Sequence, residues 1–548
     1  MKNKLFLLLL VPILILSACQ PTLASETPTL DIPTPTQAPT EAPAEPQEEE
    51  LPAYLDSSLP AEARALDLLA RMSLEEKLGQ MTQVEKNSIR PDDVARYYIG
   101  SILSGGGGYP SGNNTTEGWI SMVDGFQAAA LETPLGIPLI YGVDAVHGHN
   151  NLKGATIFPH NIGLGAADDP ELVEKIARAT AEEMLATGIP WNFAPVLAVV
   201  RDIRWGRTYE AFGEDTELVT RLGIAYQNGL QAAGEGDSLF VLATPKHYIG
   251  DGGTTWGTSK TENWKLDQGD TQMDEATLRE LFLPPYQAAV DAGAQSMMIS
   301  YSSWNGVKLH GHKYLITDVL KGELGFEGFI VSDWGAIDQI DGNYYDAVVT
   351  AINAGIDMNM VPQGYMRYIT TLTQAVEAGD VPVERIDDAV LRILTVKFKL
   401  GLFEKPFADP AYFDAVGSDV NRELAREAVA KSLVLLKNDN AALPIARDAG
   451  LVYVAGAIAD DIGIQCGGWT IEWQGKSGNI TPGTTILQAI EATAAGEVRF
   501  NRFGKFDDDR KADMAIVVVG ERPYAEGRGD NINPSLSDID IELIKRVR

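Results

Sequence analysis

From about Leu59 to Leu402, short apolar runs alternate with longer amphipathic segments, and this alternation restricts the fold more than any other feature. Apolar runs of this length are typical of buried strands. They are Ile99–Leu103, Ile137–Tyr141, Trp191–Val196, Leu239–Ala243, Ser296–Tyr301, Gly328–Ser332 and Ile356–Met360. The segments between them predict helices, among them Pro170–Ala186, Glu217–Ala233, Asp274–Ala292 and Ala347–Ala354. Seven or eight strands separated by helices favour a (β/α)8-type barrel.

A second α/β pattern follows the barrel pattern. A helix at Pro382–Leu402 and the prolines after it indicate an exit from the first domain. After a helix expected at Glu423–Ala430, the predicted strands are Ser432–Lys437, Leu451–Ala455 and Met514–Gly520. The pattern stops at Arg548 inside an amphipathic segment, so we expect an α/β sandwich domain that is C-terminally incomplete. One doubly wound sheet is the alternative fold, but no glycine-rich nucleotide-binding or Walker motif follows a strand.

The first residues have the layout of an export signal. Lys2 and Lys4 precede an apolar run to Leu16 that is short for a membrane-spanning helix. The run ends in Leu-Ser-Ala-Cys19, which resembles the lipobox of bacterial lipoproteins, in which the cysteine is lipidated. A plain signal peptide with an incidental cysteine is the alternative. We expect the protein to be exported and lipid-anchored to the bacterial cell envelope, with no other membrane contact.

The expected organisation has five segments. They are a lipoprotein signal peptide (1–19), a disordered tether rich in Pro, Thr and Glu (20–52), a catalytic barrel (53–405), a linker (406–422) and the α/β sandwich (423–548). Inside the barrel, Ser73-Leu-Glu-Glu76 matches a helix-capping box.

Charge and cysteine content exclude several functional classes. The chain has 44 Lys and Arg against 76 Asp and Glu, a net charge of −32, which repels phosphate backbones and argues against a nucleic-acid partner. Its two cysteines, Cys19 and Cys466, cannot build a disulfide framework, and no Cys/His pattern typical of zinc is present.

Polar and aromatic side chains follow five predicted barrel strands, where functional residues of such barrels stand. They include Asp144, His147 and His149, then Arg207, then Lys246, His247 and Asp251, then Tyr301 and Trp304, then Asp333 and Trp334. Each alone has a simpler explanation, since an Asp after a strand is usually a helix cap and a tryptophan is usually core. Together they are the groups a sugar site needs, because charged groups hydrogen-bond hydroxyls and indoles cover the apolar faces of a pyranose.

Longer motifs make the chain recognisable. They are MSLEEKLGQM, YGVDAVHGHNN, RDIRWGRTYEAFGED, KHYIGDGGT, SYSSWNG, GFIVSDW, GGWTIEWQG and GERPYAEGRGDN. From about Met72 to its end the chain resembles the family-3 glycoside hydrolases, the β-glucosidases and exo-β-glucanases built of a barrel and an α/β sandwich. The resemblance implies an exo-acting enzyme that removes terminal nonreducing β-D-glucosyl residues from oligosaccharides or β-glucans with retention of configuration, using no cofactor and no metal.

The resemblance also implies roles for individual residues. Asp333 matches the nucleophile and Glu526 the acid/base, with Glu521 as the reserve candidate. The positions that match binders of the glucosyl unit are Asp144, Arg207, Lys246, His247 and Tyr301. Glu262 is a weaker match, because the loop Thr254–Asn263 is longer than in relatives. Trp334 and Trp473 match the pair that sandwiches the next sugar, with Trp469 nearby, whereas Gln339 departs from an arginine common in glucan-hydrolysing members.

The two carboxyl groups need opposite protonation states. Asp333 must be ionised to attack the anomeric carbon, and we expect Arg207, Lys246 and His247 to hold its pKa down. Glu526 must arrive protonated. Three other functions remain open: a metal-dependent amidohydrolase-like barrel, the N-acetylhexosaminidase branch of the same family, and a non-catalytic sugar-binding lipoprotein. The N-acetylhexosaminidase branch has a histidine in the loop after Lys-His, and Gly250–Trp264 holds none.

Overall fold

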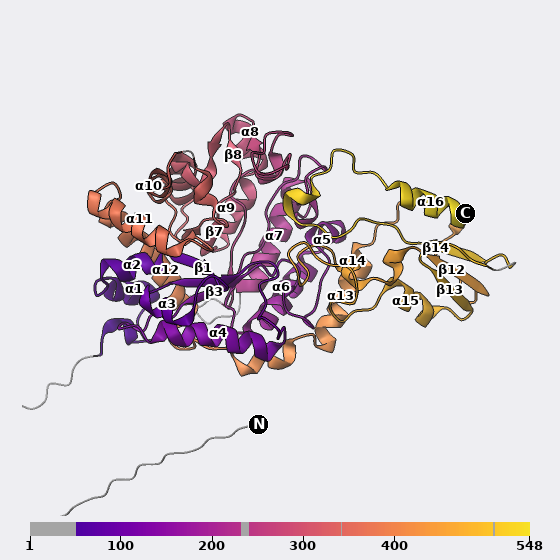
Figure 1. Cartoon of the computed structure of the whole chain (residues 1–548), viewed down its shortest axis with the longest axis horizontal. Helices are drawn as coiled ribbons and strands as arrows, with labels where there is room; N and C mark the ends of the chain where they lie inside the picture. The colour runs from indigo at the N-terminus through magenta and orange to yellow at the C-terminus, as the bar shows by residue number, and fades with distance from the viewer. Residues whose placement is uncertain (1–50, 232–239, 341, 508–509) are drawn as a thin grey trace, which may run out of the picture. The chain divides into compact units, whose positions relative to one another are not determined.

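The computed structural model describes residues 51–231, 240–340, 342–507 and 510–548, in which Leu51–Arg548 packs as one compact unit (Figure 1). The predicted lipoprotein signal with Cys19, and the tether up to residue 50, lie outside these residues. In the part of the chain that is described, no helix combines the length and the apolar character needed to cross a membrane.

Eight parallel strands close into a barrel. In ring order they are β11 (Asn359–Met360), β1 (Thr82–Glu85), β2 (Ser101–Ser104), β3 (Ile140–Val143), β4 (Trp191–Asn192), β5 (Leu242–Ala243), β7 (Ser296–Met298) and β10 (Phe329–Val331). Regular ladders join β11 through β5 and join β7 to β10. Parallel bridges between Tyr248 and Ile299, and between Val331 and Met358, complete the ring. The predicted (β/α)8-type barrel is therefore confirmed.

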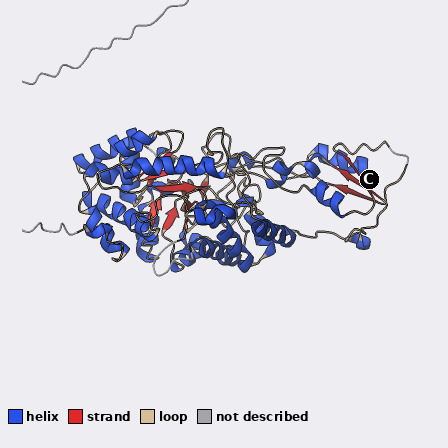
Figure 2. Cartoon of the chain, turned by 90° about the horizontal axis from the view of Figure 1, so that it is seen from below, coloured by secondary structure: helices blue, strands red, loops and turns tan. Residues whose placement is uncertain are grey.

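Helices cover the outside of the barrel strands (Figure 2). They are α1 (Ala61–Leu69), α2 (Leu74–Gln80), α3 (Pro91–Arg96), α4 (Thr116–Leu131), α5 (Asn161–Ala167), α6 (Pro170–Leu185), α7 (Thr216–Gln231), α8 (Glu275–Leu281), α9 (Pro284–Asp291), α10 (Tyr344–Ala354), α11 (Tyr365–Ala378) and α12 (Val383–Lys399), with a π-helix at Tyr314–Glu323. The capping box before α2 is present, since Ser73 Oγ accepts from Glu76 N and Glu76 Oε2 accepts from Ser73 N. The helix predicted at Asp274–Ala292 is two helices, because Pro284 and Pro285 cannot continue the hydrogen-bond ladder of α8.

Two further small sheets matter for the site. One joins β6 (Asp270–Thr271) to the hairpin of β8 (Ser303–Trp304) and β9 (Val307–Lys308), whose turn residues Asn305 and Gly306 have the positive φ that such a turn requires. The other is the parallel sheet of the second domain, ordered β13 (Glu497–Asn501), β12 (Leu451–Ala455), β14 (Met514–Val517). The helices after Leu451 are α14 (Ile462–Cys466), α15 (Ile486–Thr493) and α16 (Asp538–Val547), of which α15 contacts β13 and α16 contacts β14.

The strand predicted at Ser432–Lys437 is wrong. Ser432 ends helix α13 (Asp419–Ser432), and the apolar residues that follow have no ladder partner in the described chain. Leu436 is 91% exposed. A strand needs a neighbour for its N–H and C=O groups, and the β13-β12-β14 sheet pairs with no part of this segment. Composition indicated an apolar strand, but pairing decides whether one forms.

Candidate active site

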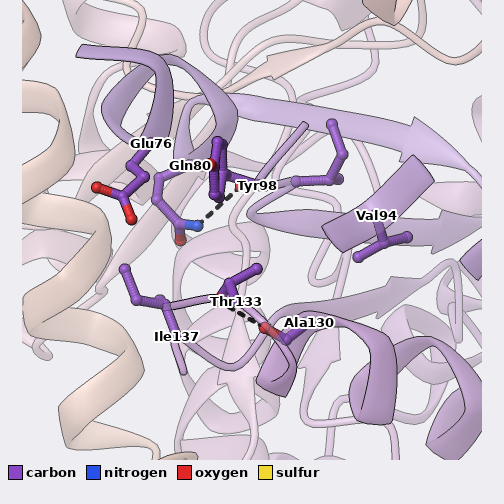
Figure 3. Close-up of a pocket in the computed structure, with 8 residues that line it drawn as sticks. Glu76, Gln80, Val94, Tyr98, Ala130, Thr133 and Ile137 are labelled. Atoms are coloured by element: carbon purple, nitrogen blue, oxygen red, sulfur yellow. Dashed lines mark hydrogen bonds between the residues drawn. The ribbon is translucent and has the colours of Figure 1, made fainter. Parts of the chain in front are cut away.

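A small cavity lies at the N-terminal end of the barrel strands and is not a ligand site. It is lined by Glu76, Gln80 and Tyr98 near the starts of β1 and β2, and by Thr133 and Ile137 before β3 (Figure 3). Its volume is about 10 Å³, which accommodates one water molecule at most. Gln80 and Thr133 already donate to the carbonyls of Tyr98 and Ala130. The chemistry therefore belongs at the opposite, C-terminal ends of the strands.

Asp333 stands directly after β10 and is held by its own loop. Its Oδ1 accepts from Trp334 N at 2.7 Å, and its backbone N donates to His310 Nε2 at 3.0 Å. Its Oδ2 lies 3.8 Å from His247 Nε2, and 13% of the side chain is exposed. One carboxylate oxygen is thus anchored by a backbone N–H while the other faces the imidazole.

Glu526 reaches the same cluster from the second domain. It begins the short 3-10 turn Glu526–Gly529, and its Oε1 lies 3.8 Å from Arg207 Nη1. The side chain is 17% exposed. Glu521, by contrast, is exposed and accepts a hydrogen bond from Tyr524 Oη at 2.8 Å. The position of Glu526 beside Arg207 favours it over the reserve candidate.

Arg207 and His247 connect the two carboxyl groups. Arg207 is buried; it binds Glu210 through Nε at 3.1 Å and Nη2 at 2.9 Å, and its Nη2 also lies 3.3 Å from His247 Nε2. His247 Nδ1 lies 2.9 Å from Asp251 Oδ2. In the tautomer these contacts favour, Nδ1 donates to Asp251 and Nε2 accepts from Arg207. The guanidinium of Arg207 therefore lies beside Glu526 and hydrogen-bonds the imidazole that neighbours Asp333.

The protonation states of the two carboxyl groups differ at neutral pH. Burial raises the pKa of Glu526 to about 8; Arg207 opposes this, while the charges of Asp267, Glu210 and Asp333 add to it. Burial also raises the pKa of Asp333 to about 6, against the lowering effects of Arg207, the Trp334 N–H and Lys246. Near pH 7 Asp333 is mostly ionised and Glu526 mostly protonated.

The expectation that cationic neighbours hold the pKa of Asp333 below its usual range is wrong. Arg207 and Lys246 do lower it, but the loss of hydration on burial is larger. His247 adds no positive charge, because burial and the charge of Arg207 keep its own pKa well below the usual histidine range. The two carboxyl groups still have opposite states, because Glu526 is shifted further than Asp333.

The predicted binders of the glucosyl unit gather at this end of the barrel. Lys246 Nζ donates to Asp144 Oδ1 at 2.7 Å, and Lys246 is almost fully buried. Tyr301 Oη donates to the backbone O of Trp334, beside Asp333. The negative charge of Asp144 contributes to the raised pKa of Asp333. Asp144, Lys246 and Tyr301 therefore lie near Asp333.

Glu262 makes no contact with this cluster among the described residues. Its residue is exposed, has a positive φ, and makes no hydrogen bond or ion pair with another described residue. Asp267 is buried at 4% exposure and accepts from Trp205 Nε1 at 3.2 Å, and its Oδ2 has no hydrogen-bond partner among the described residues. Burial raises its pKa to about 6. Asp267 is thus a site residue that sequence reasoning missed, and a role for Glu262 stays a prediction.

The tryptophans meet at a run of glycines that sequence reasoning also missed. Trp334 is 38% exposed, and a Cβ on Gly105 would lie 2.9 Å from its ring. A Cβ on Gly106 would lie 2.9 Å from Cα and Cβ of Trp473 and 3.2 Å from the ring of Trp469. The sequence signal for this contact was the run of four consecutive glycines that follows a predicted strand. Only glycine permits the backbone to approach bulky side chains this closely.

Two residues of the motif Asp144–Asn151, His147 and Asn150, bind the second domain. Asn150 donates to Trp469 O at 2.8 Å and accepts from Ile471 N at 2.8 Å. His147 Nε2 lies 3.2 Å from Thr470 Oγ1, while His149 Nε2 lies 3.0 Å from Thr187 Oγ1. The two histidines therefore have separate structural partners, which does not favour the amidohydrolase-like metal site.

The chain matches known family models and curated proteins. Residues 73–396 match the family model "Glycosyl hydrolase family 3 N terminal domain", and residues 433–548 match "Glycosyl hydrolase family 3 C-terminal domain". The lysosomal beta glucosidase of Dictyostelium discoideum is 35% identical, and the match covers 88% of this chain and 64% of the relative. The periplasmic beta-glucosidase of Salmonella typhimurium is 32% identical, and the match covers 78% of this chain and 54% of the relative.

A solved exo-1,3/1,4-beta-glucanase from a Pseudoalteromonas species superimposes with a TM-score of 0.83 at 40% identity, covering 89% of this chain and 62% of that one. The chain thus spans between half and two thirds of the length of these three proteins. Because the N-terminal family model alone matches more than half of its residues, the chain belongs to glycosyl hydrolase family 3.

Proposed function

We propose that the protein is a retaining, exo-acting β-glucosidase that releases terminal nonreducing β-D-glucosyl residues from oligosaccharides or β-glucans. The observation that carries this proposal is the pair Asp333 and Glu526, joined through Arg207 and His247 and carrying pKa values of about 6 and about 8. One carboxyl group is ready to attack and the other to give up a proton at the same pH.

The reaction has two displacements. The Asp333 carboxylate attacks the anomeric carbon while Glu526 transfers its proton to the departing glycosidic oxygen, which leaves a glucosyl ester on Asp333. Glu526, now ionised, removes a proton from water, and the water oxygen displaces Asp333 from the anomeric carbon. Two inversions give retention. Loss of a proton also returns negative charge to Glu526 beside Arg207, which stabilises it.

The chemistry around Asp333 suits a sugar with free hydroxyl groups. Asp144, Arg207, Lys246 and His247 offer charged and neutral hydrogen-bonding groups, and Asp267 Oδ2 is a buried acceptor with no partner in the part of the chain that is described. We propose Asp267 as the carboxylate that binds a substrate hydroxyl here. Trp334 packs against Gly105 and Trp473 against Gly106, and the two indoles supply apolar faces for the next sugar. The relatives' names, β-glucosidase and exo-β-glucanase, support a β-glucoside substrate.

Replacing Glu526 with alanine tests the assignment. Aryl glucosides with very acidic leaving groups need no proton, so formation of the glycosyl-enzyme should survive, followed by a slow steady state. Azide needs no deprotonation and should restore turnover by forming β-glucosyl azide. Disaccharides should remain almost uncleaved. Steady-state rates with and without azide, and identification of the azide product, are the measurements.

Glu521→Ala is the matched control, since Glu521 is an exposed carboxylate five residues away on the same loop. It should cost less activity and show no azide rescue. Rescue of Glu521→Ala but not of Glu526→Ala would exchange the two assignments. A protein that binds glucose but turns over no β-glucoside would instead favour the non-catalytic sugar-binding function.

We also propose that the protein is exported and held at the bacterial envelope by a lipid on Cys19. The support is the Leu-Ser-Ala-Cys19 sequence after the apolar N-terminal run. The relative from Salmonella typhimurium is named as periplasmic, which agrees with export.

A further inference from the structure

We propose that Asp530 is the positioning residue of the acid/base loop: its carboxylate binds four backbone N–H groups of the barrel and so sets where Glu526 stands relative to Arg207. The inference rests on the proposed role of Glu526. Asp530 follows Glu526 by four residues, across the single 3-10 turn Glu526–Gly529. Because this segment is short and folded, a displacement of Asp530 also displaces Glu526.

The contacts of Asp530 come from two different barrel loops. Its Oδ1 accepts from Gly206 N at 2.9 Å. Its Oδ2 accepts from three consecutive N–H groups, those of Lys265 at 2.8 Å, Leu266 at 2.8 Å and Asp267 at 3.1 Å. Successive N–H groups converging on one oxygen form an anion-binding nest. The barrel thus presents a binding site for one carboxylate, and Asp530 of the second domain supplies that carboxylate.

The two barrel loops are those that act on Glu526. Gly206 is adjacent to Arg207, whose guanidinium contacts Glu526, and Asp267 itself contributes one of the four N–H groups. Charges on Arg207 and Asp267 shift the pKa of Glu526 in opposite directions. A single anchor at Asp530 consequently fixes the acid/base in relation to both of its main charged neighbours.

Close backbone packing leaves the loop little freedom once Asp530 is bound. A Cβ on Gly206 would meet Asp530 N at 2.8 Å, and a Cβ on Gly527 would collide with the indole of Trp264. Asn531 N also donates to Arg204 O at 2.9 Å. Farther along the same barrel loop, Gln268 Oε1 accepts from Gln339 Nε2 at 3.0 Å. This hydrogen bond links the loop that binds Asp530 to the loop that follows Asp333. The nucleophile and acid/base loops are therefore tied to one common segment.

The test is the leaving-group dependence of Asp530→Ala in the full chain. We expect kcat/KM for 4-methoxyphenyl β-glucoside, which needs proton donation, to fall about 10²-fold, and for 2,4-dinitrophenyl β-glucoside less than about 10-fold. Asp530→Asn keeps one carbonyl oxygen for the nest, so its kcat/KM for 4-methoxyphenyl β-glucoside should lie between those of Asp530→Ala and the unsubstituted protein. If Asp530→Ala does not fold, Asp530→Asn is compared on the same two substrates. Asp513→Ala is the control, since Asp513 also binds two backbone N–H groups, of Gly450 and Leu451, within the second domain.

A double variant separates positioning from general destabilisation. If Asp530 acts through Glu526, adding Asp530→Ala to Glu526→Ala should cost little more activity on the dinitrophenyl substrate. Equal losses on both aryl glucosides, no loss on either, or fully additive losses in the double variant would overturn the inference. Failure of azide to rescue Glu526→Ala would overturn the proposed function instead, so the two failures are distinguishable.

Discussion

Replacing Gly206 with alanine should disable proton donation without touching either carboxyl group. The added Cβ would lie 2.8 Å from both Gly529 C and Asp530 N, and closer still to Glu526 O, whereas ordinary contact begins near 3.4 Å. The acid/base loop must therefore retreat by more than 3.4 − 2.8 = 0.6 Å, with the largest shift at Glu526 itself. Because a misplacement of about 1 Å can cost on the order of 10²-fold, we expect kcat/KM for 4-methoxyphenyl β-glucoside to fall by about that factor.

The assay is steady-state kinetics together with thermal unfolding. Gly125→Ala is the control: Gly125 lies inside α4, no atom of the described residues would be within 4 Å of an added Cβ, and alanine favours the helix. It should keep full activity. If Gly206→Ala stays within about threefold of the unsubstituted protein, the two loops are not held in the close contact on which the reasoning depends.

Two further predictions concern pH and anchoring. The pH profile of kcat/KM should be a bell centred near pH 7. Activity should fall below about pH 6 as Asp333 becomes protonated and above about pH 8 as Glu526 loses its proton. An optimum near pH 5 would contradict the raised pKa values of the two carboxyl groups. Cys19→Ser should move the protein from membrane to soluble or unprocessed fractions on cell fractionation, because acyl chains supply the anchoring energy, and unchanged membrane association would refute the lipoprotein interpretation.

Apolar periodicity predicted the barrel where its strands are apolar, and failed where they are not. The apolar run Ile99–Leu103 predicts a strand and forms most of β2. Thr82–Glu85 forms β1 without an apolar pattern, because its polar residues face the protein interior, where Gln83 donates to Ser101 Oγ at 2.8 Å. Buried polar pairs of this kind carry no apolar signal. The strand predicted at Ser432–Lys437 failed for the converse reason, being apolar but unpaired.

The sequence predicted the candidate site only in part, as it did the fold. Motifs at strand ends located Asp333, Arg207, Lys246 and His247, because the topology of a parallel barrel gathers those ends. Asp267 and Asp530 were missed as site residues, since their importance depends on how a long loop folds onto another domain. Nor could the sequence predict that burial outweighs the nearby cations and raises the pKa of Asp333.

Trapping the glycosyl-enzyme tests the central claim most directly. In a 2-fluoro-substituted β-glucoside the fluorine slows both displacements, whereas an activated leaving group speeds only the first, so the enzyme should accumulate with one fluoroglucosyl group attached. Peptide mass spectrometry is expected to place that group on Asp333, and Asp333→Ala should take up no label while remaining folded. Label on any other residue, or a labelled Asp333→Ala variant, would contradict the account.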